Sequence, residues 1–331
     1  MSGPVQRTIE SNGIRLNIAE QGNGPPVILC HGFPESWYSW RHQLTALAAA
    51  GFHAVAPDMR GYGKSNRPEA IDQYTVFHLI GDLVGLLDAI EAPTAVIVGH
   101  DWGAQIAWQA ARLRPDRFRA VASLSVPLRP RGPARPTSVM PQTADAQFYQ
   151  LYFQQPGVAE AEMERDPRVT LLSMLYGASG EGAAAFRDAS ARGEITRTPG
   201  MVPRGGCMLQ GSTTTLPAWL SEADIEFYAG ELRRSGFRGP LNYYRNIDRN
   251  WELMAAFADV RVTVPSLFVT GDHDLVMAAP PGIDQNLANL RQFVTTLREV
   301  RILPGCGHWT QQERPDEVSA ALIDFIRGLP D

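Results

Sequence analysis

A carboxylate, Asp101, stands between Gly99 and Gly103 in the stretch VGHDWGA. The spacing is that of a sharp turn from a strand into a helix, which holds its central side chain out as a nucleophile. An aspartate in that place attacks a saturated carbon that carries a leaving group, and the product is an alkyl ester. The alternative is an aspartate that only caps the helix starting at Trp102, because Asp is a favoured N-cap residue.

A base and an acid for this nucleophile follow later in the chain. His308 lies in the loop PGCGHWTQQERP, between the last expected strand and the last expected helix. Asp272 and Asp274 lie in VTGDHDLV, at the end of another expected strand, and either can orient a histidine. Local Asx turns in a solvated loop are the alternative for these two aspartates. The nucleophile precedes the acid and the acid precedes His308, the order used by hydrolases built around such a turn.

Two backbone N–H groups are candidates for holding an oxyanion. The segment HGFPESWYSW, residues 31–40, directly follows an expected strand at 26–30. A loop there can present the N–H of Phe33 toward the nucleophile, and the N–H of Trp102 is the second donor. The alternative is an ordinary strand-to-helix turn with Ser36 as its cap.

Four tyrosines are candidates for a proton donor. A phenol can protonate an alkoxide leaving group, since its ordinary pKa is about 10 and burial keeps it neutral. Tyr149 and Tyr152 are three residues apart and share one helical face, whereas the adjacent Tyr243 and Tyr244 point in different directions. The residues alone leave all four open. The alternative is packing of apolar rings, which we favour for Tyr152 and less for Tyr243.

The elements that must position these residues alternate between short apolar runs and segments of helical spacing. An Asn12-Gly13 pair between two alternating runs predicts a hairpin ahead of them. The alternation predicts a parallel sheet covered by helices on both faces. The expected strands are residues 26–30, 53–58, 94–100, 119–126, 264–272 and 297–305. The expected helices are residues 35–51, 74–90, 102–116 and 315–329.

The alternation is interrupted once. It stops at Pro127 and resumes near residue 264, and from about 145 to 255 we find only helical patterns and loops. This predicts a helical lid inserted into an α/β domain. The expected domains are an α/β-hydrolase core of residues 1–127 and 253–331 and a helical lid of residues 128–252.

Together, these motifs resemble those of the soluble epoxide hydrolases, in the α/β-hydrolase family. The resemblance covers nearly the whole chain and includes HGFPESWYSWRHQ, DMRGYGKS, VGHDWGA and GHWTQQERP. Within the lid it includes the more specific FYQLYFQQPGVAEAE and SGFRGPLNYYRN. It implies the α/β-hydrolase fold, for which we expect a mostly parallel eight-stranded sheet. It also implies an enzyme that adds water to an epoxide, giving a vicinal diol through a covalent aspartyl ester.

The resemblance implies that Tyr149 and Tyr244 are the two proton donors. The expected catalytic residues are therefore Asp101, Asp274, His308, Tyr149 and Tyr244. The expected oxyanion hole is formed by Phe33 and Trp102. The expected substrate pocket is lined by Phe33, Trp102, Tyr152, Phe153 and Trp309.

A haloalkane dehalogenase, which uses the same Asp-His-Asp triad, is the alternative function. Such enzymes hold the halide with the indole after the nucleophile, here Trp102, and usually with an Asn or a second Trp. The position after His31 and Gly32, often Asn in them, is Phe33, and this favours the epoxide. A binding protein on an inactive scaffold would be expected to have lost a triad member, and none is lost. Asp101 itself disfavours an esterase.

Composition excludes several other classes. The chain has 331 residues, 44% of them hydrophobic, which is enough for one large domain or two. The net charge of −5 argues against nucleic acid as a partner. Three cysteines fit neither a metal site nor a disulfide framework, and they indicate reduced thiols in a cytoplasmic protein. No signal-peptide pattern begins the chain, and no stretch approaches the roughly 18 apolar residues of a membrane span.

The expected partners are a small hydrophobic epoxide and water, with no cofactor and no metal. The sequence allows a homodimer without fixing the oligomeric state. It leaves open which epoxide is used, with what regio- and enantioselectivity, and whether for detoxification or biosynthesis.

Overall fold

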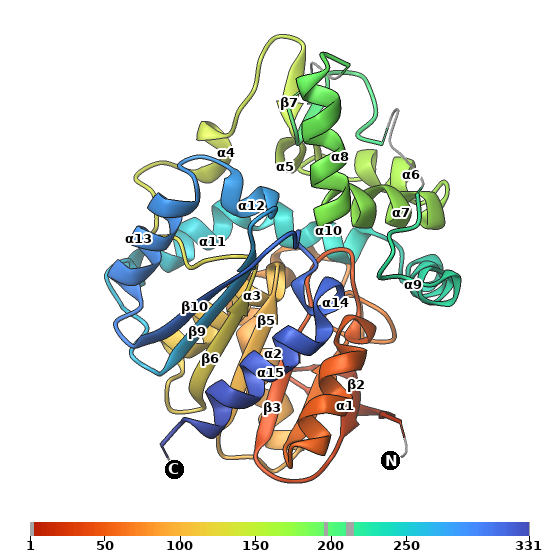
Figure 1. Ribbon diagram of the computed structural model, residues 1–331. Helices are drawn as coiled ribbons and strands as arrows, with labels where there is room; N and C mark the ends of the chain where they lie inside the picture. The colour runs from red at the N-terminus through yellow and green to blue at the C-terminus, as the bar shows by residue number, and fades with distance from the viewer. Residues whose placement is uncertain (1–2, 195–197, 210–214, 331) are drawn as a thin grey trace.

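A central sheet of eight strands forms the core of the computed structural model, which describes residues 3–194, 198–209 and 215–330 (Figure 1). The strand order is β1-β2-β4-β3-β5-β6-β9-β10. The pairs β1/β2 and β2/β4 are antiparallel and the remaining pairs are parallel. The predicted fold class is therefore confirmed. The strands are β1 (Val5–Ser11), β2 (Ile14–Gln21), β3 (Pro26–Cys30), β4 (His53–Pro57), β5 (Ala95–His100), β6 (Phe118–Leu124), β9 (Ser266–Gly271) and β10 (Leu297–Leu303).

Strand β5 shows why the central strands are mainly apolar. All six of its residues are buried. Ile97 belongs to the apolar core beneath one face of the sheet, and Val96 and Val98 belong to the core beneath the other. Successive side chains of a strand point to opposite faces, so a strand covered on both sides needs apolar residues at every position.

Helices cover both faces of the sheet. Side chains of α1 (Arg41–Ala49) and α15 (Pro315–Arg327) belong to one core, and both helices lie in front of the sheet in Figure 1. Side chains of α2 (Val76–Ala89), α3 (Trp102–Leu113) and α13 (Ile283–Phe293) belong to the other core. The hairpin predicted at Asn12-Gly13 joins β1 to β2.

The helix predicted at residues 35–51 is shorter and less regular than expected. A 3₁₀ turn, η1 (Trp37–Trp40), comes first, and its N-cap Ser36 accepts a hydrogen bond from the backbone of Tyr38. The α-helix α1 then begins at Arg41. The tighter turn leaves residues 31–36 as a loop at the end of β3. A second 3₁₀ turn, η2 (Ile71–Tyr74), precedes α2.

Most helices between β6 and β9 lie above the carboxyl ends of the parallel strands (Figure 1). We keep the name lid for residues 128–252, a division that stays a prediction. Its helices are α4 (Pro136–Val139), α5 (Tyr149–Tyr152), α6 (Val158–Met163), α7 (Pro167–Gly177), α8 (Gly180–Ala191), α9 (Glu222–Ser235), α10 (Arg238–Arg245) and α11 (Ile247–Leu253). The turn η3 (Met254–Phe257) leads back to the core, where α12 (Leu275–Ala278) and α14 (Thr310–Glu313) are also found.

The prediction that residues 145–255 contain only helices and loops is wrong in one place. Two strands, β7 (Ala146–Phe148) and β8 (Met201–Pro203), form a small antiparallel sheet. Three residues are too few to show the alternation that identifies a strand in a sequence. Among the described residues, no helix has the length and hydrophobicity of a membrane span.

Candidate active site

Asp101 occupies a strained turn between β5 and α3. Its φ of 52° and ψ of −117° lie in a backbone region that residues other than glycine rarely adopt, and this conformation costs about 1–3 kcal/mol. Gly99 and Gly103 make the turn possible. A Cβ atom on Gly99 would lie 2.1 Å from the carbonyl oxygen of Gly103, and one on Gly103 would lie 2.0 Å from that of Cys30. The carboxylate makes no capping hydrogen bond to α3, which contradicts the alternative of a simple N-cap.

His308 lies between two carboxylates. Its Nε2 is 3.5 Å from Asp101 Oδ2, and its Nδ1 is 3.2 and 3.3 Å from the two oxygens of Asp274. Asp274 is buried and also accepts the backbone N–H of Val276 at the start of α12. Asp272 instead accepts the N–H of Gly305, and 43% of its side chain is exposed. Of the two aspartates that the sequence left open, Asp274 is the one that contacts His308.

The two carboxylates determine the protonation of this histidine. Burial acts to lower the pKa of His308, but the charges of Asp274 and Asp101 outweigh it and raise the pKa well above its usual value. Burial likewise acts to raise the pKa of Asp101, but His308 and the N–H of Phe33 outweigh it and lower the pKa. Asp101 is therefore an ionised carboxylate beside an imidazolium.

The loop after β3 approaches the Asp101 carboxylate closely. The backbone N–H of Phe33 donates to Asp101 Oδ1 over 2.8 Å. A Cβ atom on Gly32 would lie 2.4 Å from the same oxygen, so only glycine lets the loop come this near. Trp102, the other predicted donor, is the first residue of α3 and directly follows Asp101. A negative charge on Asp101 Oδ1 is therefore held by a fixed backbone donor.

Tyr149 and Tyr244 come together across the site from different helices. Tyr149 begins α5 and Tyr244 lies in α10, and their ring centroids are 6.0 Å apart. The Tyr244 ring also contacts Trp102, with centroids 5.0 Å apart, and Phe33, with centroids 5.4 Å apart. These contacts place the Tyr244 ring over the strained turn.

Both of these phenols are neutral near pH 7. Burial raises the pKa of Tyr149 to about 12, with Asp101 adding to the rise and a hydrogen bond from Gln150 opposing it. Burial, with Tyr149 and Asp101, raises the pKa of Tyr244 well above its usual value. Gln150 donates to the Tyr149 hydroxyl over 3.0 Å, which leaves the O–H of Tyr149 free to donate. The pair can therefore supply a proton to an oxygen held between the two rings.

The other two candidate tyrosines are committed elsewhere. The hydroxyl of Tyr152 donates to Glu162 inside the lid over 2.7 Å. The hydroxyl of Tyr243 donates to the carbonyl of Arg60 in the core over 2.9 Å. This is the packing alternative that the sequence favoured for Tyr152. The rings predicted to line the pocket share one apolar cluster: Phe33, Trp102, Tyr152, Phe153 and Trp309.

Sequence reasoning missed two buried carboxylates near the triad. Glu35 accepts hydrogen bonds from Gln311 and Gln312 and pairs with His100, whose Nε2 lies 2.8 Å from the carbonyl oxygen of His308. Glu313 accepts from the backbone on both sides of His308. Both residues stood in the motifs HGFPES and GHWTQQERP, but their acidic side chains gave no sign of burial.

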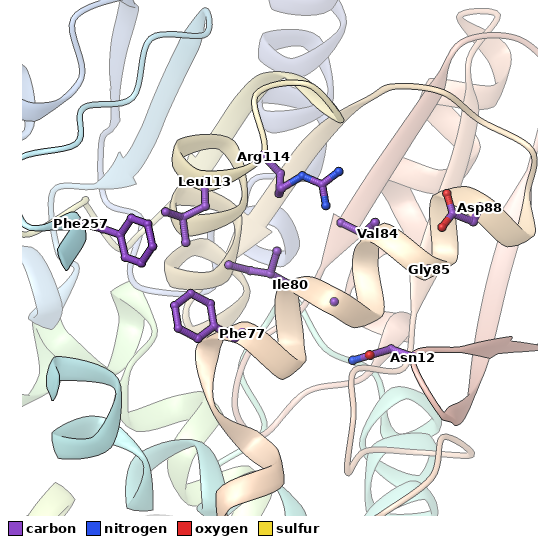
Figure 2. Close-up of a pocket in the computed structure, with 10 residues that line it drawn as sticks. Asn12, Phe77, Ile80, Val84, Gly85, Asp88, Leu113, Arg114 and Phe257 are labelled. Carbon is purple, nitrogen blue, oxygen red and sulfur yellow. The ribbon is translucent and has the colours of Figure 1, made fainter. Parts of the chain in front are cut away.

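A hollow of about 530 Å³ lies away from this site, between α2, α3 and η3. Figure 2 shows Phe77, Ile80 and Leu113 gathered in it, with Arg114 at its edge. None of the predicted site residues lines it. Within the part of the chain that the structure describes, no group of three or more His, Cys, Asp or Glu side chains is arranged to hold a metal ion.

The chain is similar to known proteins in both sequence and structure. A family model described as the alpha/beta hydrolase fold matches residues 25–315. Epoxide hydrolase A of Mycobacterium tuberculosis is 46% identical, over 99% of both chains. Epoxide hydrolase 1 of Siraitia grosvenorii is 39% identical, over 97% of both. A solved epoxide hydrolase from an endophytic Streptomyces has a TM-score of 0.91 at 45% identity, covering 99% of this chain and 96% of that one.

Proposed function

The chain belongs to the epoxide hydrolases of the α/β-hydrolase fold family, and we propose that it opens its substrate through a covalent ester on Asp101. The position of Asp101 carries the proposal. Its carboxylate accepts the N–H of Phe33 and faces His308, and its charge adds to burial in raising the pKa of Tyr149 and of Tyr244. Nucleophile, base and proton donors therefore surround one small volume.

In the first half-reaction, Asp101 attacks a ring carbon of the epoxide. Oδ1 is held by Phe33, so Oδ2 is the attacking oxygen. The new bond joins Oδ2 to carbon, and the carbon–oxygen bond of the ring breaks. The released oxygen takes a proton from Tyr149 or Tyr244, which leaves a hydroxyl on the bound alkyl group and a tyrosinate in the lid.

In the second half-reaction, water cleaves the ester. His308 takes a proton from water, and the hydroxide attacks the carbonyl carbon of the Asp101 ester. The N–H groups of Phe33 and Trp102 hold the resulting oxyanion. On collapse the alkoxide leaves with the proton from His308, which gives the diol. The acid proton of Asp101 then passes to His308, so the carboxylate and the imidazolium of the resting site are both restored.

Alkylation itself prepares the base. The ester has no charge, so one of the two carboxylates that raise the pKa of His308 disappears when it forms. The pKa of His308 falls, and the imidazolium gives its proton to the tyrosinate, which restores the tyrosine and leaves His308 as a base. Asp274 remains to hold the ring through Nδ1.

A single turnover in heavy-oxygen water tests the ester. We expect the label to enter the Asp101 carboxylate, because water attacks the ester carbonyl and its oxygen stays on the protein. Peptide mass mapping locates the label. Label that appears in the diol after one turnover would mean direct attack by water and would remove Asp101 as nucleophile.

The surroundings of the Trp102 indole argue against the dehalogenase alternative. The Trp102 indole packs edge-on against the Tyr244 ring, with centroids 5.0 Å apart, so a phenol ring stands beside the indole that would bind a halide. The relatives with high identity are named epoxide hydrolases. The aromatic residues near Asp101 support a hydrophobic epoxide as substrate. Cytoplasmic location and a homodimer stay predictions.

A further inference from the structure

The loop that carries His308 is hydrogen-bonded to the lid. The backbone N–H of His308 donates to the carbonyl oxygen of Ala178 over 2.8 Å. The indole N–H of Trp309 donates to the carbonyl oxygen of Leu175 over 2.8 Å, and Trp309 is buried. Both acceptors belong to the end of α7 and the turn that follows it. The proposed base is therefore supported by a segment outside the sheet that carries the nucleophile.

The lid turn and the His308 loop touch backbone to backbone. A Cβ atom on Gly180 would lie 2.1 Å from the carbonyl oxygen of Gly305. A Cβ atom on Gly307 would lie 2.3 Å from the nitrogen of Gly180 and from the carbonyl carbon of Ser179. Neither the lid turn nor the His308 loop has room for a side chain at this contact. The loop can therefore shift only slightly while the turn stays in place.

One carboxylate joins the two segments. Glu313 Oε2 accepts the N–H of Gly180 over 2.8 Å and that of Gly307 over 2.9 Å. Its Oε1 accepts the N–H of Trp309 over 3.0 Å. A single side chain thus binds both sequence neighbours of His308 and the first residue of α8. Hydrogen bonds to an ionised acceptor are roughly twice as strong as neutral ones.

Glu313 is buried, so its charge is costly in free energy unless other groups stabilise it. Only 8% of the residue is exposed, and in the described part of the chain it forms no ion pair with Lys, Arg or His. Burial raises the pKa of Glu313, and the three N–H groups and the charge of His308 oppose the rise. A buried carboxylate is costly unless its hydrogen bonds repay the loss of water. Here the carboxylate accepts hydrogen bonds from three backbone N–H groups, all at the lid–loop junction.

We propose that Glu313 and the turn 178–180 form a latch that positions His308 for cleavage of the ester. The inference rests on the function proposed above. Alkylation uses Asp101, Tyr149 and Tyr244, which other elements hold, whereas His308 acts as a base only afterwards. The latch therefore serves the second half-reaction, and the lid positions the base as well as the proton donors. Glu313 is a positioning residue that acts through His308.

The test compares two carboxylates of equal burial. Glu162 is also 8% exposed and also accepts three hydrogen bonds, from the Tyr152 hydroxyl and from the N–H groups of Met208 and Leu209. It lies in the lid and bonds to nothing in the His308 loop. Glu313→Gln replaces an acceptor oxygen by an NH₂ group, so at least one N–H of the latch loses its partner. Glu162→Gln makes the same change away from the base.

The two half-reactions are measured separately under single-turnover conditions. A displacement of about 1 Å can lower the rate of a catalysed step by about 100-fold. In Glu313→Gln we expect hydrolysis to fall about 10- to 100-fold, alkylation to change less than about threefold, and ester-bound enzyme to accumulate. Glu162→Gln should keep the wild-type ratio of the two rates. A separate burst measurement with excess epoxide counts correctly folded enzyme, so poor folding lowers the burst amplitude without imitating a change in this ratio.

A second variant approaches the latch from the lid. Gly180→Ala should also slow hydrolysis selectively, because its Cβ forces the turn away from Gly305. If Glu313→Gln keeps the wild-type ratio, or both rates fall together, Glu313 only stabilises the fold and the proposal is overturned. Failure of the proposed function looks different, because His308→Gln would then accumulate no ester at all.

Discussion

Two aspartates only two residues apart, Asp272 and Asp274, give the sharpest test at the level of single residues. Asp274 holds His308 Nδ1, so Asp274→Asn should slow ester hydrolysis by about 100-fold or more through loss of ring orientation and charge. Asp272→Asn should change it little, because that carboxylate accepts the N–H of Gly305 and lies near His273 rather than His308. Rapid-quench measurement of ester decay compares the two. The opposite ranking would move the acid role to Asp272.

The pair of phenols makes a second prediction. Either tyrosine can protonate an oxygen held between them, so Tyr149→Phe or Tyr244→Phe alone should slow alkylation by a limited factor. The double variant should lose about 100-fold or more, because no donor remains. Tyr152→Phe is the control, since its hydroxyl donates to Glu162. Pre-steady-state alkylation by one epoxide measures all four. A double variant that alkylates at the wild-type rate would reduce both tyrosines to packing.

The pKa shifts predict that the two half-reactions respond differently to pH. Alkylation needs ionised Asp101, whose pKa is lowered, and neutral phenols, that of Tyr149 having a pKa of about 12. Its rate should stay level between about pH 5 and 9, because both groups keep their required forms there. Hydrolysis needs neutral His308, so its rate should rise with pH through the pKa of that residue in the ester.

The Asp274→Asn variant is a control for the pH experiment. Among the groups that raise the pKa of His308, the charge of Asp274 makes the largest contribution. In Asp274→Asn the rise of hydrolysis should therefore move to lower pH, although the maximal rate is smaller. Stopped-flow rates of both steps across the range measure this. A rise that stays at the same pH would mean that another group limits the step.

Some residues of the site could be predicted from the sequence, and others could not. Asp101 and His308 were predictable because a fixed spacing and chain order identify them. The choice between Asp272 and Asp274 needed the direction of each side chain in one short loop. The choice among the tyrosines needed the packing of α5 against α10. The role of Glu313 could not be predicted, because its partners are backbone N–H groups and one of them, at Gly180, is far away in the chain.

At the level of secondary structure, the turn between β5 and α3 predicts a large difference between two glycines. Gly103→Ala would bring a Cβ within 2.0 Å of the Cys30 carbonyl oxygen, so we expect a loss of stability of about 1–3 kcal/mol or more. Gly230→Ala in α9 meets nothing within 4 Å and should stabilise by about 0.5–1 kcal/mol. Urea unfolding measures both. Equal effects would mean that the turn tolerates a side chain.

The elements themselves were predicted with uneven success. Short apolar runs gave the central parallel strands, since burial on both faces leaves a continuous signal, as in β5. The edge strand β10 was predicted without that signal, because only one of its seven residues is buried. The strands β7 and β8 escaped because they are three residues long and gain their pairing from each other. The start of α1 was misplaced because η1 has the same apolar residues in a tighter turn.

At the level of the whole molecule, the strand order is the part that the sequence could not supply. Alternation predicts parallel strands but does not say that β3 lies between β4 and β5. That order places the loop after β3 directly beside the turn after β5, which is why Phe33 meets Asp101. The site depends on this neighbour relation more than on any one motif.

Hydrogen bonds fasten the lid to the core on two sides. His308 and Trp309 hold the turn after α7, and the hydroxyl of Tyr243 in α10 donates to the carbonyl of Arg60 in the core. A rigid swing of the lid would break these buried bonds, at about 1–3 kcal/mol for each group left without a partner. Substrate and product are therefore expected to pass by rotation of side chains rather than by a hinge motion of the lid, which takes microseconds to milliseconds. The rotamers of the side chains along the path to Asp101 then limit the size of the molecules that can pass.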